Sequence, residues 1–105
     1  MTTTAPPAAP IPNAVTDDVK RIRAALATTI PPKTETNLLI GTWNLRAFGG
    51  LIPKWQSTEH DSPKRDWHAL ACIAAVVERF DVTAVQETRR NTTALFALLN
   101  RLGPR

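Results

Sequence analysis

Two polar side chains stand at the ends of the two most strand-like stretches of the sequence. Residues 38–50 read LLIGTWNLRAFGG, in which Asn44 follows an apolar run. Residues 82–90 read VTAVQETRR, in which Glu87 follows a β-branched run. A carboxylate can anchor Mg2+ beside a substrate phosphate, and a neutral amide can donate to a phosphate oxygen. The pair therefore points to chemistry on phosphate esters.

Arginine follows each of these polar residues. Arg46 comes after Asn44, and Arg89 and Arg90 come after Glu87. The chain holds 13 Lys and Arg against 9 Asp and Glu, a formal net charge of +4, which favours an anionic partner. Because exposed arginines are often only solvated, phosphate contact is one of two interpretations for them.

A purely structural interpretation also exists for the polar pair. Asn44 can hydrogen-bond the turn that follows it, and Glu87 can be an ordinary solvated carboxylate. Gln86 alternates to the strand face opposite Glu87, so we expect it to play a structural part.

The elements that must position these residues alternate along the chain. Thr16 is a candidate cap for an amphipathic helix that Pro31 ends, and Ser62 is a candidate start for a second helix. Asn91 is a candidate cap for a third helix over residues 92–102. The order helix, strand, helix, strand, helix predicts an α/β fold with two parallel strands, the first of them buried.

The organisation along the 105 residues is expected to be simple. Residues 1–14 form a Pro/Ala/Thr-rich lead-in with a disorder-like composition, residues 15–31 hold the first helix and the start of a linker, and residues 37–105 hold the strands. No secretory signal or membrane-length apolar run is visible, and the lone Cys72 fits a reducing compartment. These features predict a soluble, cytoplasmic protein with no membrane partner.

Two strands are few for a parallel sheet, which normally has further strands at its edges and helices on both faces. We therefore expect the chain to be the amino-terminal part of a larger α/β domain, or a remnant of one.

Three segments resemble the endonuclease/exonuclease/phosphatase superfamily, and above all its deoxyribonuclease I-like branch. They are GTWNLRAFGG, DVTAVQETR and the intervening helix RDWHALACIAAVVERF, and the resemblance covers residues 37–103. It implies part of a four-layered α/β sandwich that hydrolyses phosphate esters with Mg2+, or with Mn2+ in its place.

The resemblance also implies roles for single residues. Asn44 matches the asparagine that orients the scissile phosphate or its catalytic partners, and Glu87 matches the metal-binding glutamate. Arg46 and Arg89 match arginines at the nucleic-acid surface, with DNA preferred to RNA.

The family's later histidine and aspartate motifs have no counterpart, since His60 and His68 lie in other segments. A general base is thus missing, and we expect the lone chain to be inactive without the carboxy-terminal remainder of the domain as a partner.

Two rival interpretations stay open. One is a basic module that binds nucleic acid without cutting it, through Arg46, Lys54, Arg89 and Arg90. The other is a non-functional remnant that does not fold.

Other residue types with chemical potential have structural interpretations. Trp43 and Trp67 are expected in the core, and Trp55 is expected to fill a hydrophobic gap rather than stack on a base. His68 and Cys72 lie one helical turn apart, which is ligand spacing, but the sequence shows no other thiol and no acid near them. We therefore expect no zinc site and a packed or partly exposed Cys72 thiol.

Overall fold

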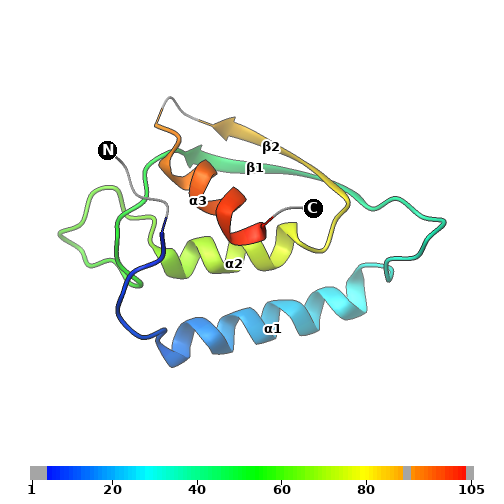
Figure 1. Cartoon of the computed structure of the whole chain (residues 1–105), viewed down its shortest axis with the longest axis horizontal. Helices are drawn as coiled ribbons and strands as arrows, with labels where there is room; N and C mark the ends of the chain where they lie inside the picture. The colour runs from blue at the N-terminus through cyan, green and yellow to red at the C-terminus, as the bar shows by residue number, and fades with distance from the viewer. Residues whose placement is uncertain (1–4, 89–90, 104–105) are drawn as a thin grey trace.

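The computed structural model describes residues 5–88 and 91–103 and shows an α/β fold in the predicted order (Figure 1). The strands run parallel, as expected. The elements are α1 (Asn13–Thr29), β1 (Ile40–Phe48), α2 (Trp67–Val77), β2 (Val82–Thr88) and α3 (Thr93–Leu102).

The two strands pair in regular register over only part of their length. Ile40 lies opposite Val82, and the unbroken ladder ends where Asn44 lies opposite Gln86. Beyond that point the register shifts, and the next pair is Phe48 with Thr88. β1 therefore carries more residues than β2 between these pairs, which is the signature of a β-bulge or similar irregularity.

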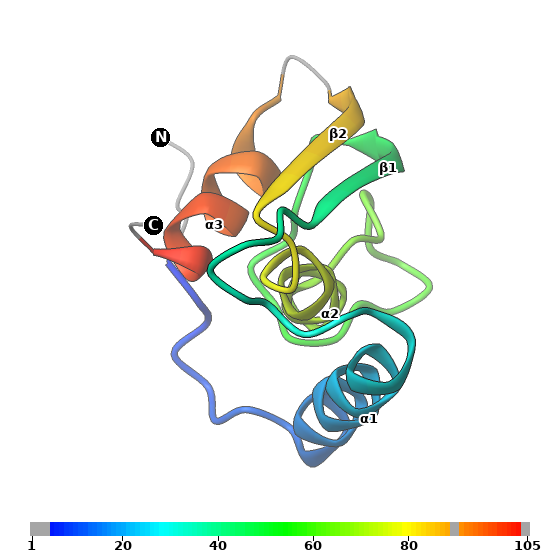
Figure 2. The ribbon, with the colours of Figure 1, turned by 90° about the vertical axis from the view of Figure 1, so that its right-hand side faces the viewer.

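The described helices all lie on one side of the sheet, so the prediction of a buried first strand was wrong (Figure 2). Ile40 is 61% exposed and Val82 is 52% exposed. The side chains of Thr42 and Ala84, on the same face of the sheet, are exposed as well. A parallel strand is buried only where helices cover both of its faces, and the described elements cover one.

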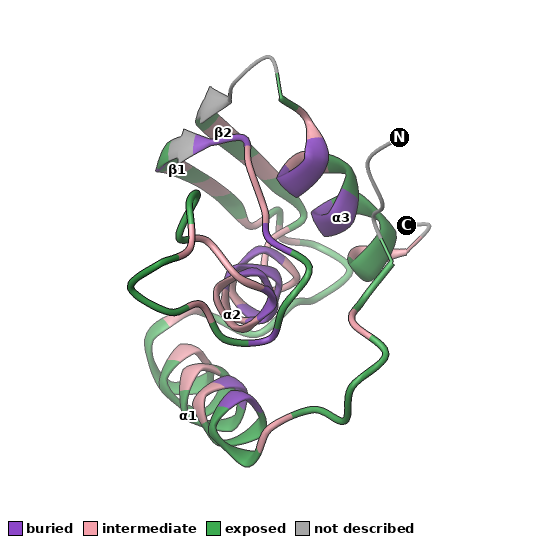
Figure 3. Ribbon diagram, turned by 90° about the vertical axis from the view of Figure 1, so that its left-hand side faces the viewer, coloured by how far each residue is buried: buried purple, intermediate pink, exposed green. Residues whose placement is uncertain are grey.

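The central helix α2 lies between the sheet and α1, and this explains its broad apolar stripe. Figure 3 shows buried residues on several sides of α2, whereas most of α1 is exposed. Val15 and Val19 are the buried residues of α1, and Ile22 packs partly buried against the same core. The apolar residues of α2 thus serve both the sheet and α1.

Two tryptophans close the core at the amino-terminal end of α2. Trp67 is buried, and its ring meets that of Trp55 edge to face with centroids 6.4 Å apart. Trp55 is only 6% exposed, and its indole N–H donates to the carbonyl of Ala9 at 3.0 Å. Trp55 thus fills a hydrophobic gap, as predicted. Its hydrogen bond also holds the segment around Ala9 against the core. Trp43 is only partly buried.

Both of the first two helix starts differ from the predicted caps. α1 begins at Asn13 after Pro12, whose carbonyl accepts from the N–H of Val15 at 3.0 Å, so Thr16 lies inside the helix. α2 is capped by Asp66, whose carboxylate accepts from the N–H of Ala69 at 2.8 Å, and Ser62 lies in the preceding loop.

The start of α2 has a tertiary cause. The N–H groups of Trp67 and His68 donate to the carbonyls of Lys54 and Trp55, at 2.9 and 3.0 Å. A helix needs partners for its first N–H groups, and here the preceding loop supplies them.

α3 follows the prediction closely. Thr92 is its N-cap, and the preceding Asn91 accepts from the N–H of Thr93 at 3.0 Å, so the predicted capping side chain is shifted by one position. Gly103 ends the helix with φ of 73°, a backbone conformation that glycine adopts without strain, and its N–H donates to Leu99. Within the described part of the chain, no helix has the length and apolar character needed to cross a membrane.

Candidate functional site

Asn44 lies at the last position of the regular β1–β2 ladder, and its side chain is exposed. It was predicted to end its strand, but β1 continues to Phe48, so that prediction was wrong in position. What ends at Asn44 is the regular pairing, because the register shifts immediately after it. The amide is therefore presented on the open face of the sheet where the backbone becomes irregular.

Gln86 is the backbone partner of Asn44 across the ladder, and it too is exposed. Gln86 was predicted to lie on the strand face opposite Glu87 and to play a structural part, and that prediction stays untested because the Glu87 side chain is not described. The Asn44 and Gln86 amides come from directly paired positions on the open face. Sequence reasoning did not find this pairing because register depends on the length and path of the connection and not on the strand residues alone.

Glu87 is the next residue of β2 and belongs to the carboxyl-terminal half of that strand. Its backbone therefore lies one step beyond the Asn44–Gln86 pair, at the same end of two co-directional strands. The structure does not describe the Glu87 side chain, so contact between the Asn44 amide and the Glu87 carboxylate stays a prediction. Arg89 and Arg90 lie outside the described residues.

Arg46 is exposed and lines a small pocket beside the strand end. The pocket has a volume of about 200 Å³, and its lining is formed by Arg46, Gly50, Pro63, Lys64 and Arg65. Three cationic side chains from two separate segments thus line one surface depression. We call Arg46, Lys64 and Arg65 the basic pocket.

Arg65 is held firmly in the basic pocket. Its guanidinium carbon lies 5.2 Å from the centroid of the Phe48 ring, within the range of a cation–π contact. It also donates to the backbone carbonyl of Arg46 at 2.9 Å. Burial lowers the pKa of Arg65 from its ordinary value, but an arginine starts so high that it stays charged.

Lys64 donates to the carbonyl of Thr58 at 2.8 Å, which is a neutral partner. Sequence reasoning missed both Lys64 and Arg65. The adjacent basic pair before the second helix was a visible signal, but nothing in the sequence showed that the loop returns to Arg46.

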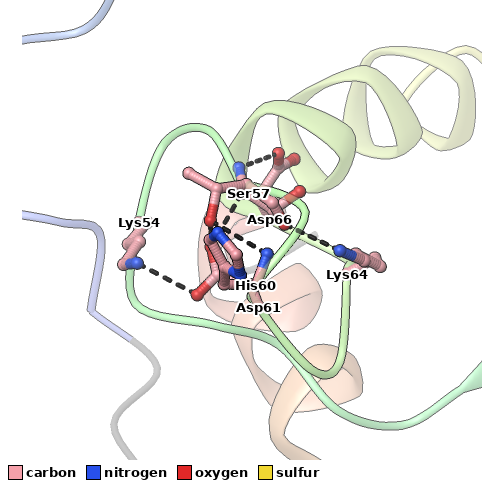
Figure 4. Close-up of polar contacts among 7 residues, drawn as sticks. Lys54, Ser57, His60, Asp61, Lys64 and Asp66 are labelled. Atoms are coloured by element: carbon pink, nitrogen blue, oxygen red, sulfur yellow. Dashed lines mark hydrogen bonds and ion pairs between the residues drawn. The ribbon is translucent and has the colours of Figure 1, made fainter.

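Lys54, by contrast, is tied into its own loop (Figure 4). Its ammonium group lies 2.9 Å from the carboxylate of Asp61. Hydrogen bonds from the backbone of Thr58 and from Lys54 lower the pKa of Asp61 to about 2, so this carboxylate is ionised at neutral pH. The predicted part of Lys54 in nucleic-acid binding is weakened, because its charge is paired.

The 51–66 loop is ordered by a second acid as well. Asp66 accepts from Ala69 as the cap of α2, and its other carboxylate oxygen accepts from the backbone N–H of Ser57 at 2.8 Å (Figure 4). One carboxylate thus fixes both the helix start and the loop that carries Lys64. The loop is therefore folded back on the start of α2.

A second group of chemically capable side chains lies between α1 and α2. His68 Nε2 is 2.7 Å from a carboxylate oxygen of Asp18, and Cys72 follows His68 by one turn of α2. One potential ligand atom from each of Asp18, His68 and Cys72 lies within 4.8 Å of the other two. The expectation that no acid lies near His68 and Cys72 was therefore wrong, because packing of α1 brings Asp18 to them.

The electrostatics of this second group follow from its neighbours. Hydrogen bonds from Arg21 and His68 hold the pKa of Asp18 below its usual value. Burial raises the pKa of the Cys72 thiol, and the carboxylates of Asp18 and Asp66 raise it further. Without a cation, Cys72 is therefore a protonated thiol at neutral pH.

Comparison with known proteins leaves the chain without an assigned family. No protein-family model, no curated protein and no solved structure matches it. The site therefore defines only a class: an α/β protein that presents amide and basic side chains at the irregular end of a parallel strand pair.

Proposed function

We propose that the chain carries the amino-terminal part of a Mg2+-dependent phosphodiesterase site that acts on nucleic acid, with DNA preferred to RNA. Asn44 orients the phosphate, Glu87 holds the metal, and Arg46 contacts the nucleic-acid backbone. One observation carries the proposal: the regular parallel register ends at Asn44 and Gln86, one residue before Glu87 and close in sequence to Arg46 of the basic pocket.

The donor set suits the metal. Mg2+ takes hard oxygen ligands and is usually bound by one or two carboxylates together with substrate phosphate and water. Glu87 would supply a carboxylate from β2, and the exposed amides of Asn44 and Gln86, whose backbone positions come one step earlier, would supply neutral oxygens and N–H donors. When bound, the ion would neutralise charge on the phosphate and polarise its ester bond.

The basic pocket supplies the complementary charge. Arginine recognises phosphate through paired N–H donors, and a lysine attracts it as a point charge. Arg46 and Lys64 are both exposed, so a phosphodiester backbone can reach them from solvent. Arg65 is partly buried and braces the pocket through Phe48.

Neither histidine is placed to act as a general base at this site. His68 is engaged with Asp18 between the helices, and the ring of His60 lies 3.5 Å from Glu59 in the loop. Because a general base typically contributes a large share of such a rate, we expect the 105-residue chain to bind phosphate esters without hydrolysing them efficiently.

Binding of a fluorescently labelled DNA duplex, measured by anisotropy in Mg2+ and in EDTA, tests the proposal. We expect Glu87→Gln to weaken binding about tenfold in Mg2+ and not in EDTA, as for loss of one charge-assisted contact. Removal of a carboxylate by itself favours binding to a polyanion, so a loss seen only with Mg2+ reports a metal-mediated contact. Glu59→Gln, which removes an exposed loop carboxylate and changes the net charge equally, is the matched control and should weaken binding in neither buffer.

The same samples decide between the proposals. Binding that is equal in Mg2+ and EDTA and unchanged by Glu87→Gln would contradict the metal role and support the second candidate, a basic module that binds without cutting. The exposed Lys64 and Arg46 favour that candidate. A parallel plasmid-nicking assay should show no cleavage above the buffer control, and strong nicking that needs Mg2+ and Glu87 would refute the expected inactivity.

A further inference from the structure

The Asp18, His68 and Cys72 side chains form a cluster that the phosphodiesterase proposal does not use. They come from two helices that pack side by side along much of their length (Figures 1 and 2). His68 and Cys72 share one face of α2, because they lie one turn apart, and Asp18 faces them from α1. We call these three residues the interhelix cluster.

The cluster is neither deeply buried nor freely exposed. The side chains of His68 and Asp18 are 23% and 34% exposed, and Cys72 is likewise intermediate. This level of exposure gives a cation a path from solvent and leaves room for a water molecule as an additional ligand. The buried Val15 and Val19 anchor α1, so Asp18 is held in place by packing and not only by its own hydrogen bond.

The distances are close to those that a tetrahedral ion requires. Bonds of about 2.0–2.3 Å from zinc to nitrogen, oxygen and sulfur set neighbouring ligand atoms about 3.3–3.8 Å apart. The three ligand atoms lie within 4.8 Å of one another, and His68 Nε2 lies 2.7 Å from a carboxylate oxygen of Asp18. An ion bound between His68 Nε2 and Asp18 would require the imidazole to carry its proton on Nδ1, by exchange with solvent, and small rotations of the side chains would widen this separation.

The chemistry of the donors selects the kind of ion. Thiolate and imidazole ligands favour Zn2+ and related transition metals, whereas Mg2+ prefers an all-oxygen set. The competing partner of Asp18 is Arg21, whose side chain is 74% exposed and can move into solvent at little cost.

We propose that Asp18, His68 and Cys72 bind one Zn2+ ion, with water as the fourth ligand, and that this ion clips α1 to α2. Binding requires the Cys72 thiol to lose its proton to solvent and the His68 ring to be neutral. The part assigned to the ion is to hold the two helices together, and the site is independent of the proposed Mg2+ site.

Titration of the full chain with Co2+, a spectroscopic substitute for Zn2+, tests this site directly. We expect one equivalent to produce a thiolate-to-cobalt charge-transfer band and the visible bands of tetrahedral cobalt, and Zn2+ to displace it. Asp18→Asn and His68→Gln should each weaken binding at least tenfold, a typical lower bound for loss of a ligand or its close partner. The matched controls Asp17→Asn and His60→Gln, which alter an exposed neighbour and the other histidine, should leave it unchanged.

Two results would overturn the zinc site. One is the absence of a charge-transfer band in the unaltered chain, and the other is a band of equal affinity in the Asp18 and His68 variants, which would mean adventitious binding to a lone thiol. If either variant fails to fold, the rate at which Cys72 is alkylated in the unaltered chain tests the site instead. One equivalent of Zn2+ should slow that reaction at least tenfold and excess Mg2+ should not, and equal rates with and without Zn2+ would refute the site.

Discussion

Replacement of Phe48 by alanine is expected to lower the free energy of unfolding by about 3–5 kcal/mol, the usual cost of emptying a buried aromatic position. Phe48 is completely buried near the irregular end of the strand pair. Its ring also lies under the Arg65 guanidinium, so the variant removes both core packing and the support of a charged side chain. Urea denaturation followed by circular dichroism measures the loss.

The matched control for Phe48→Ala is Phe96→Ala. Phe96 lies on α3 with 51% of its surface exposed, so its replacement should change stability by less than about 1 kcal/mol. A cooperative transition in the unaltered chain would at the same time exclude the unfolded remnant considered from the sequence. Equal losses in the two variants, or no cooperative transition at all, would contradict the packing described for β1.

Charge reversal at Arg46 is expected to weaken DNA binding about tenfold at low salt, because the change removes one phosphate contact and places a carboxylate in the basic pocket. The magnitude of the slope of log affinity against log salt concentration should also fall by about 1, as expected for the loss of one phosphate contact. Anisotropy titrations of Arg46→Glu across a series of salt concentrations measure both effects.

Lys20→Glu is the matched control for Arg46→Glu, since it changes the net charge by the same amount at an exposed position of α1. It should leave the affinity within about threefold of the unaltered chain, as expected for a charge outside the contact surface. If both variants weaken binding equally, the interaction follows net charge alone, and the basic pocket has no special part in it.

The element order could be predicted because each element carries a local signal. The helical repeat of Trp67, Leu70, Ala74 and Val77 and the β-branched run of β2 were both visible, and the structure has a helix and a strand at these positions. The parallel arrangement followed from the length of the connection between the strands. Local pattern and final fold agree at these positions.

Helix starts were predictable only where the capping partner is local. Asn91 was found because it bonds to Thr93, two residues away. Asp66 was missed in favour of Ser62, since the start of α2 depends on backbone carbonyls of Lys54 and Trp55 that only the folded loop brings into place. Tertiary contacts decided between two acceptable local caps.

The candidate sites show the same division. Asn44 and Glu87 could be proposed as a pair from sequence because neighbouring parallel strands point the same way, although β1 continues beyond Asn44. The opposition of Asn44 and Gln86 and the approach of Asp18 to His68 could not, since each depends on how distant segments pack. β1 was predicted to be buried but is exposed on one face, because none of the described elements covers that face of the sheet.

The most direct test of the proposed phosphodiesterase site is where a divalent ion binds. Mn2+, which substitutes for Mg2+ and broadens nearby nuclear magnetic resonance signals, can be added in small amounts to the isotope-labelled chain. The account predicts selective broadening of the backbone amides of Asn44, Leu45, Gln86 and Glu87, which is lost in Glu87→Gln and kept in Glu59→Gln. The proposed site would be contradicted if the broadened amides lay only near other carboxylates, such as Asp17 and Glu35, and the signals of Asn44, Leu45, Gln86 and Glu87 stayed unchanged.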